Sequence, residues 1–366
     1  MTRDAPGSLP HRAGGGAPQA PTGRLRTWGR FVRFEHTLFS LPLLFAGVLL
    51  GAGGFDVPLS LLGLVLLAGT GARTAALGLN RIIDRRIDAA NPRTAARELP
   101  SGAMALGEAW ALTGAGVAVY AVAAWWIAPI CLALAPVPLV VFVGYPYLKR
   151  WTPWCHLGVG LGLAMAPLGG WFAVRLGFGD AAPALLLALF TLAWVAGFDV
   201  IYATLDVEFD RSTGIHSLPA RYGGRTALRI ARGLHALAWT CLAVLVFWRL
   251  TWPAALAPLL VVAALLAWEH ARARDIDLAF FRINVWIGFA ALATVAAGVW
   301  LPPGRGLLAV TTAELFRSFP GQPVRWMEQA GERIEFSRDP ERSEGVGDDG
   351  ARSFRRIPLA PMLEPL

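Results

Sequence analysis

Residues 182–210 read APALLLALFTLAWVAGFDVIYATLDVEFD, an apolar run that ends directly in acidic side chains. The run carries no charge up to Phe198, and it is about as long as a helix that crosses roughly 30 Å of hydrocarbon. A bilayer offers no water to unpaired backbone groups, so such a segment must satisfy them internally. The stretch therefore predicts a membrane-spanning helix with a cluster of acids at one end.

Similar apolar windows recur along the whole chain. Hydrophobic residues make up 55% of its 366 residues and charged residues 16%, against about 25% charged in soluble domains. The windows do not show the alternating pattern of membrane barrel strands. The sequence predicts an all-α fold, a polytopic membrane helical bundle of about nine transmembrane helices. The expected spans are 36–54, 60–82, 106–127, 129–147, 154–176, 182–205, 225–248, 253–270 and 282–301.

The two ends of the chain differ from this apolar centre. Residues 1–29 form a basic leader rich in Gly and Pro, and residues 302–366 form a charged, Gly-containing tail. Neither has enough apolar surface to offset its ordering entropy, so we expect both to be disordered. The transmembrane domain is expected at 30–301. The three cysteines, Cys131, Cys155 and Cys241, match neither a metal site nor a disulfide framework and are interpreted as packing residues.

Basic residues cluster in the even-numbered connections, whereas the odd-numbered connections offer little beyond Arg175 and Arg249. By the positive-inside rule, the even connections and the N-terminus are expected in the cytoplasm. The formal net charge of +8 then needs no nucleic acid as a partner.

The first polar motif lies at the end of the second expected helix. Asn80, Asp84 and Asp88 follow one another at four-residue steps, in the segment NRIIDRRID. Four residues are about one helical turn, so the three side chains share one face at about 6 Å per step. Oxygen ligands at this spacing suit a hard divalent cation shared with a phosphate group.

The second polar motif ends the sixth expected helix. Asp199, Asp206 and Asp210 stand at offsets of seven and four, with Tyr202 on nearly the same face. Four helices separate the two motifs, a spacing that hints at a weak parallel repeat. We expect the two acidic loops to face one another.

Acids at the ends of apolar helices would repel one another and resist desolvation unless cations neutralise them. Mg²⁺ is the preferred candidate, because it binds through one or two carboxylates and substrate phosphates, and the chain offers no Cys and His set for zinc. The alternative is that the acids pair with neighbouring arginines as solvated helix ends. The arginines in question are Arg81, Arg85, Arg86 and Arg211.

Two basic residues near the motifs can each be interpreted in two ways. Lys149, four residues after Tyr145, could hold a diphosphate as a point charge or could be an ordinary positive-inside residue. Arg73 lies about two turns inside the second span, on the face of Asn80 and Asp84. A charge at that depth needs a partner, either a substrate anion or an acid of the other motif.

A few polar residues could also border the cavity. Arg33, Glu35 and His36 begin the first span, and Asn284 lies in the ninth. Each could equally be an interfacial anchor or a satisfied buried group.

These residues resemble the UbiA family of intramembrane prenyltransferases. Asn80, Asp84 and Asp88 match the family's N-x-x-x-D-x-x-x-D motif, and the resemblance runs from about residue 30 to 301. The other matches are Asp206 and Asp210 for D-x-x-x-D, Asp199 and Tyr202 upstream of it, and Tyr145 and Lys149 for Y-x-x-x-K.

Within that family the segments RFEHTLFSLP, NPRTAARELPSG, DVEFDRSTGIHSLPARYG and FFRINVWIG are similar to the 4-hydroxybenzoate polyprenyltransferase branch, including its futalosine-route menaquinone relatives. The resemblance implies Mg²⁺-dependent transfer of a polyprenyl group from its diphosphate to an aromatic acid in ubiquinone or menaquinone biosynthesis. The acceptor would be 4-hydroxybenzoate or 1,4-dihydroxy-6-naphthoate. The enzyme would lie in the cell inner (plasma) membrane, with its active site on the cytoplasmic side.

The resemblance also implies roles for single residues. The metal ligands would be Asn80, Asp84, Asp88, Asp206 and Asp210. Substrate binding would involve Arg33, Arg73, Asn80, Tyr145, Lys149 and Tyr202. The catalytic acids would be Asp84, Asp88, Asp199, Asp206 and Asp210, with Asp199 taking the ring proton. The lipid bilayer and the two substrates are the expected partners, with no obligatory protein partner.

Three alternatives stay open. An ion-coupled transporter also carries acids in membrane helices, although its sites usually lie at the midplane. A phosphotransferase acting on CDP-activated alcohols also uses clustered acids, but its D-x-x-D-G-x-x-A-R signature is missing here. Within the UbiA family, the acceptor could instead be haem, chlorophyllide or homogentisate.

Overall fold

The computed structural model describes residues 23–32, 37–272 and 282–300, and three short strands between residues 326 and 358. The chain divides into two compact units, residues 1–306 and 307–366. The leader up to residue 22 lies outside the described residues, as do Arg33, Glu35 and His36. The expectations for those segments therefore remain predictions.

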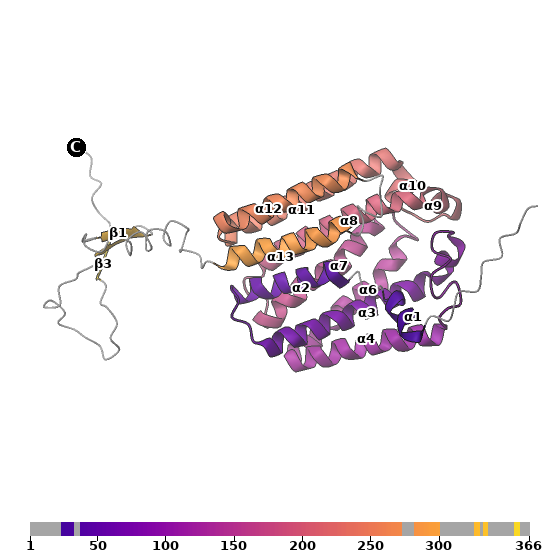
Figure 1. Ribbon diagram of the computed structural model, residues 1–366, viewed down its shortest axis with the longest axis horizontal. Coiled ribbons are helices and arrows are strands. Elements are labelled where there is room, and N and C mark those ends of the chain that lie inside the picture. Colours follow the sequence, from indigo (N-terminus) through magenta and orange to yellow (C-terminus); the bar gives the residue numbers. More distant parts are fainter. Residues whose placement is uncertain are drawn as a thin grey trace, which may run out of the picture. The chain divides into compact units, whose positions relative to one another are not determined.

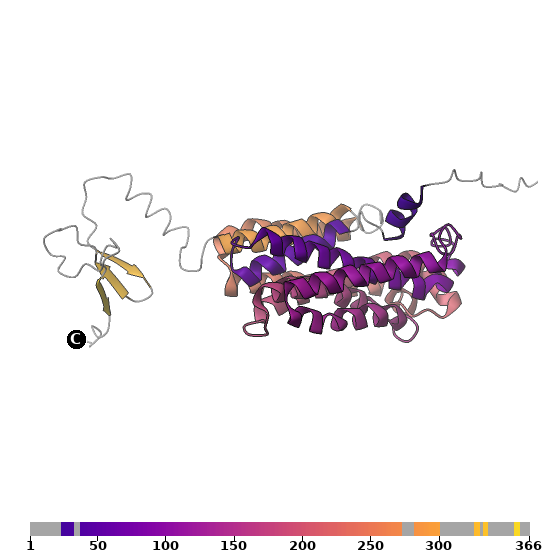
Figure 2. The same cartoon turned by 90° about the horizontal axis from the view of Figure 1, so that it is seen from below.

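The first unit is a bundle of helices that lie side by side, as the two perpendicular views show (Figures 1 and 2). Its described elements are α1 (Arg24–Phe31), α2 (Thr37–Ala52), α3 (Leu59–Ala90), α4 (Leu106–Ile127), α5 (Pro129–Leu134), α6 (Pro136–Leu148), α7 (Cys155–Arg175), α8 (Ala182–Tyr202), the 3₁₀ turn η2 (Ala203–Asp206), α9 (Val207–Thr213), α10 (Leu218–Tyr222), α11 (Gly224–Arg249), α12 (Trp252–Ala271) and α13 (Asn284–Trp300). The short helices α1, α9 and α10 lie at one end of the bundle (Figure 1).

Each of the expected spans coincides with helix in this bundle, α5 and α6 together forming the fourth. Among the described residues, 7 helices are long and apolar enough to cross a membrane by length and composition. The apolar parts of α2 and α13 are shorter, at Ser40–Ala52 and Asn284–Trp300. The fold is thus an all-helical, multi-pass bundle, whereas the count of nine crossings stays a prediction.

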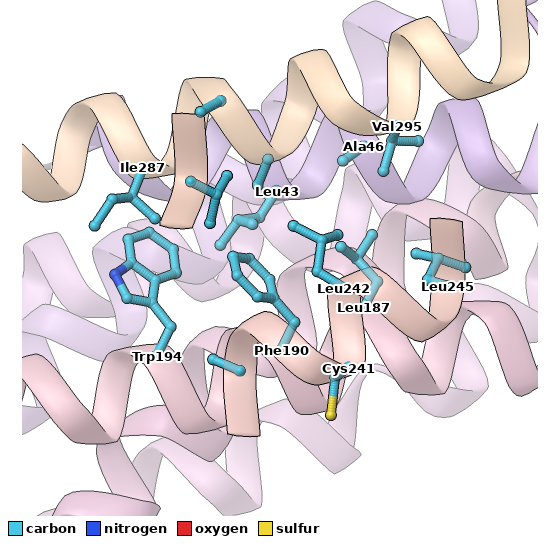
Figure 3. Close-up of a cluster of buried hydrophobic side chains, with 14 of the residues drawn as sticks. Leu43, Ala46, Leu187, Phe190, Trp194, Cys241, Leu242, Leu245, Ile287 and Val295 are labelled. Atoms are coloured by element: carbon cyan, nitrogen blue, oxygen red, sulfur yellow. The ribbon is translucent and has the colours of Figure 1, made fainter. Parts of the chain in front are cut away.

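The centre of the bundle is α8, which packs against α7 and α11. Phe190 and Trp194 of α8 are fully buried, and Figure 3 shows them between side chains of α2, α11 and α13. Ala and Gly residues alternate with these large rings, which lets the helix be surrounded on nearly every side. A helix buried all round is a rigid support for whatever extends from its end.

The crossing of α2 and α7 depends on glycine. A Cβ atom on Gly170 would clash with the carbonyl oxygen of Leu44, and one on Gly47 would clash with that of Pro167. Small residues at such crossings let the two backbones approach closely, as is common in membrane bundles. By contrast, a Cβ atom on Gly169 would meet no atom within 4 Å.

We predict that Gly170→Val destabilises the bundle by about 1–3 kcal/mol, because overpacking forces the two helices apart. Thermal unfolding of the purified protein in detergent measures this effect. The matched control is Gly169→Val, which should unfold like the wild type. Equal unfolding temperatures for the two variants would contradict the proposed close contact between α2 and α7.

A small polar cluster is buried among α8, α12 and α13. The indole Nε1 of Trp194 donates to Asn284 Oδ1 at 2.7 Å, and Asn284 Nδ2 donates to Glu269 Oε1 at 3.0 Å. Asn284 and Glu269 are both 0% exposed. Asn284 was expected to border the substrate cavity or to be a satisfied buried group, and the second interpretation is correct.

The second unit contains β1 (Trp326–Gln329), β2 (Glu332–Glu335) and β3 (Arg355–Pro358), which form an antiparallel sheet in the order β1-β2-β3. The composition of the tail did not predict these strands. The remaining residues of 302–366 lie outside the described part of the chain, so their expected disorder is untested.

Candidate active site

A cavity of about 210 Å³ lies between the C-terminal ends of α3, α6 and α8 and the N-terminal end of α7. Its wall brings together side chains from both acidic motifs and from the segment between them. The expected site residues that line it are Asn80, Asp84, Asp88, Tyr145, Lys149, Asp199, Tyr202, Asp206 and Asp210. Their chemical roles remain predictions, but their convergence in one cavity is a property of the fold.

Asp84 is the most deeply buried acid of the site, with 2% of its surface exposed. Its Oδ2 atom lies 2.6 Å from Lys149 Nζ and accepts a hydrogen bond of 3.1 Å from Asn80 Nδ2. Its other oxygen, Oδ1, is buried without a hydrogen-bond partner. The carboxylate is therefore half satisfied, with one oxygen left for a ligand.

Asp88, one turn further along α3, pairs with the segment that follows the helix. The Arg97 Nη1 atom donates to both oxygens of Asp88 at 2.8 Å. The hydroxyl of Thr94 donates to the backbone oxygen of Asp88 at 2.9 Å. These contacts fold residues 91–97 back over the end of α3, which continues to Ala90 and carries both acids of the first motif.

The same segment reaches the second acidic motif. Arg93 Nε donates to Asp206 Oδ1 at 2.9 Å, its Nη2 atom pairs with Asp206 Oδ2, and Asn91 Nδ2 donates to Asp206 Oδ1 at 2.9 Å. Arg93 Nη1 also donates to the Tyr202 hydroxyl at 2.6 Å. The expectation that the two acidic loops face one another is confirmed. Burial is the largest single effect and lowers the pKa of Arg93, but Asp206, Tyr202 and Asp88 together raise it by more, so this pKa lies above its ordinary value.

The second motif is not one straight ladder. Helix α8 ends at Tyr202, and the chain continues through η2 before α9 begins at Val207. The expected helix through 205 is therefore interrupted at Ala203, and the two acids that follow have different partners. Asp206 pairs with Arg93, whereas Asp210 accepts a hydrogen bond of 2.7 Å from Ser217 Oγ.

The turn after α9 brings Ser217 to Asp210. Gly214 ends α9 with φ of 71°, a left-handed conformation that glycine adopts without steric strain. Two residues later, the backbone N–H of His216 donates to the backbone oxygen of Lys149 at 2.7 Å. The loop after α9 is thereby attached to the end of α6, and the cavity is closed on that side.

The role of Arg73 stays a prediction. This residue was expected to hold a substrate anion or to pair with an acid of the second motif, but it does not line the cavity. Its Nη1 atom donates to Ser40 Oγ of α2 at 3.1 Å. Arg73 precedes Asp84 by about three helical turns, so it lies on the same face of α3 at a deeper level of the bundle.

The neighbouring arginines that were considered as partners of the acids have other contacts. Arg81 lies 3.3 Å from Glu98, Arg85 donates to the backbone oxygen of Ile82, and Arg211 donates to that of Ala220. Asp84 and Asp88 are buried and pair with Lys149 and Arg97, and the half-buried Asp206 pairs with Arg93.

Sequence reasoning missed several residues that the structure places in the cavity. They are Asn91, Arg93, Thr94, Arg97, His156 and Ser217. The segment NPRTAAR follows an acidic helix end, a position from which basic side chains can fold back. His156 gave no signal, because a single histidine in an apolar run usually reads as a satisfied core residue.

Comparisons with known proteins agree with this geometry. The model of the UbiA prenyltransferase family matches residues 40–285, which is more than half of the chain. This chain belongs to the UbiA prenyltransferase family. It is accordingly a membrane-embedded prenyltransferase, and neither the transporter nor the phosphotransferase alternative is needed.

Two curated relatives illustrate the range of similarity. A polyprenyl transferase of Arthrobotrys oligospora is 34% identical over 194 residues, covering 50% of this chain and 53% of the relative. The chain thus spans about half the length of that relative. A 4-hydroxybenzoate octaprenyltransferase of Albidiferax ferrireducens is 30% identical over 305 residues, covering 76% of this chain and 96% of the relative.

Two solved structures share the fold. A UbiA homologue from Aeropyrum pernix K1, solved in its apo form, is 33% identical and superposes with a TM-score of 0.65 over 71% of this chain and 97% of its own. A UbiA homologue from Archaeoglobus fulgidus, bound to DMAPP and Mg²⁺, is 19% identical with a TM-score of 0.55 over 73% and 99% of the two chains.

The donor atoms of this UbiA prenyltransferase fit a hard divalent cation. Among the residues that the structure describes, no group of three or more His, Cys, Asp and Glu side chains forms a closed metal site. Mg²⁺ typically takes one or two carboxylates and completes its shell with water and substrate phosphates. The buried, unpartnered Oδ1 atom of Asp84 is the clearest open ligand of this kind.

We predict that Lys149→Met destabilises the protein by about 1–3 kcal/mol, because the buried Asp84 carboxylate loses its cation. The double variant Lys149→Met/Asp84→Asn should recover most of that loss, since a neutral amide needs no cation. Thermal unfolding in detergent without Mg²⁺ measures both.

The control for this pair is Arg86→Met, which removes an exposed charge on α3 and should leave the unfolding temperature unchanged. If the double variant is no more stable than Lys149→Met, the stabilising role of the ion pair is contradicted.

Proposed function

We propose that this UbiA prenyltransferase transfers a polyprenyl group from a polyprenyl diphosphate to a small aromatic acid, and that it requires Mg²⁺. The observation that carries the proposal is the meeting of two acidic motifs and three basic side chains in one cavity at the end of an apolar bundle. The acids can share divalent cations with a diphosphate, and the bases can bind its oxygens directly.

The apo ion pairs supply the binding groups for such a substrate. Lys149, Arg93 and Arg97 each hold one acid in the absence of ligand. When cations occupy the carboxylates, these three side chains become available to donate hydrogen bonds to phosphate oxygens. Mg²⁺, when bound, neutralises the charge that develops on the leaving diphosphate. The protein thus exchanges internal ion pairs for ligand contacts and leaves few charges uncompensated.

The apolar part of the wall protects the reactive intermediate. Ile87, Val159 and Phe209 line the cavity beside the acids. Ionisation of an allylic diphosphate leaves a carbocation that water would capture. A partly apolar cavity limits the water that reaches the cation before the ring of the acceptor attacks it.

The acceptor is proposed from the relatives. They include a 4-hydroxybenzoate octaprenyltransferase of Sodalis glossinidius and a 4-hydroxybenzoate solanesyltransferase of Synechocystis sp.. We propose 4-hydroxybenzoate or 1,4-dihydroxy-6-naphthoate as the acceptor, with a role in ubiquinone or menaquinone biosynthesis. Haem, chlorophyllide and homogentisate are the alternatives within the family. We further propose that the protein lies in the plasma membrane with the cavity and the N-terminus on the cytoplasmic side, because basic residues gather there.

We predict that Asp84→Ala and Asp206→Ala each lower product formation at least about 100-fold, since each removes a charge that stabilises the leaving group. The assay uses isolated membranes, a labelled polyprenyl diphosphate, Mg²⁺ and one of the two aromatic acids. Removal of Mg²⁺ with EDTA should abolish the product in the wild type.

Two matched controls lie beside these acids. Arg86→Gln on α3 and Glu208→Gln on α9 change exposed charges that do not line the cavity, so both should keep wild-type activity. If the wild type prenylates neither acid, the proposed acceptor class fails. If activity survives EDTA or both Asp variants, the proposed metal-dependent mechanism fails.

A further inference from the structure

A histidine and an aspartate meet on the wall of the cavity, on neighbouring helices. His156 Nδ1 at the start of α7 lies 2.7 Å from Asp199 Oδ2 near the end of α8. His156 is 3% exposed, whereas the Asp199 side chain is 26% exposed. The imidazole is therefore buried behind the carboxylate, and the carboxylate faces the cavity.

The surroundings of His156 settle which of its nitrogens carries the proton. The backbone N–H of Leu218 lies 3.3 Å from His156 Nε2 and donates to it. A backbone N–H can only donate, so Nε2 is the acceptor and Nδ1 carries the proton. Nδ1 therefore donates to Asp199 Oδ2.

Close packing of α7 against α8 also holds this pair in place. Gly160 lies one turn after His156, and a Cβ atom there would clash with the carbonyl oxygen of Leu192 on α8. The two helices are thus in close contact beside the pair. On the other side, Leu218 follows Ser217, which holds Asp210. The pair is attached to the same loop that holds one of the metal-binding acids.

We propose that His156 is the residue that positions Asp199, the expected acceptor of the ring proton, for the transfer reaction. This inference rests on the proposed function. The allylic C–O bond of the diphosphate breaks with its electron pair on oxygen, and a ring carbon of the acceptor then bonds to the allylic carbon. The C–H bond at that ring carbon breaks next, its electron pair restores the aromatic ring, and the proton goes to the Asp199 carboxylate.

His156 contributes by orientation and charge. Its Nδ1–H bond stabilises the Asp199 carboxylate and turns it toward the cavity, as a second hydrogen-bonding group does for a catalytic base or a metal ligand. Because Asp199 pairs with His156 and not with a cation of the diphosphate subsite, it stays available when Lys149 and Arg93 move to the phosphates. The two tasks of the cavity, leaving-group stabilisation and proton removal, are thereby divided between separate side chains.

The test compares His156→Leu with His156→Asn in the membrane assay. Asn places an amide N–H near the position of Nδ1, whereas Leu removes the donor. We expect kcat to fall about 10- to 100-fold in His156→Leu, in the range seen when a supporting hydrogen bond is lost. His156→Asn should recover most of that loss. The KM for the polyprenyl diphosphate should be unchanged in both.

The decisive readout is the isotope effect on kcat with a ring-deuterated acceptor, using whichever of the two acids the wild type prenylates. If proton removal depends on the His156–Asp199 pair, the effect should be larger in His156→Leu than in the wild type. The control Trp154→Leu changes an exposed side chain directly before α7 and should behave as the wild type.

Three outcomes would overturn the inference. The first is wild-type kcat in His156→Leu, and the second is an unchanged isotope effect with a lowered kcat. The third is equal loss in the Leu and Asn variants, which would indicate a packing role. Absence of product from the wild type itself would instead contradict the proposed function, so the two failures are distinguishable.

Discussion

The rest of the structure depends on one constraint, the need to neutralise carboxylates at the end of an apolar bundle. Asp84, Asp88 and Asp206 each pair with a basic side chain. Two of these bases, Arg93 and Arg97, lie in the segment that follows α3, and the third, Lys149, lies at the end of α6. A charge in a low-dielectric site is costly unless it is paired, so these ion pairs determine how the connecting segments fold. The cavity is the space that remains between them.

The helical scaffold explains why this arrangement can be held in place. Helix α8 is buried on nearly all sides by α2, α7, α11 and α13, so the acids at its end extend from a rigid support. Close crossings at glycine positions fix α7 against α2 and α8. The segment after α3 then needs only short side-chain contacts to close the cavity. Rigid helices and paired loops together give a site that is preorganised yet able to exchange its ion pairs for a charged ligand.

The sequence was most informative where one simple periodicity decides the structure. Steps of four residues correctly put Asn80, Asp84 and Asp88 on one face of α3, and apolar windows located the helices. It failed where tertiary contacts decide. The interruption of α8 at Ala203 has no Gly or Pro to mark it, and His156 has no sequence neighbour that reveals Asp199 as its partner. These features depend on contacts between residues far apart in the sequence, which helical periodicity does not encode.

The most direct test of the central claim is a structure of this protein with Mg²⁺ and a non-reactive thio analogue of the polyprenyl diphosphate. The account predicts that Asp84 and Asp206 ligate Mg²⁺, while Lys149 and Arg93 leave these acids and donate to phosphate oxygens. It also predicts that the contact between His156 and Asp199 persists. A structure in which the ion pairs Asp84–Lys149 and Asp206–Arg93 remain intact, with the diphosphate bound elsewhere, would contradict the account.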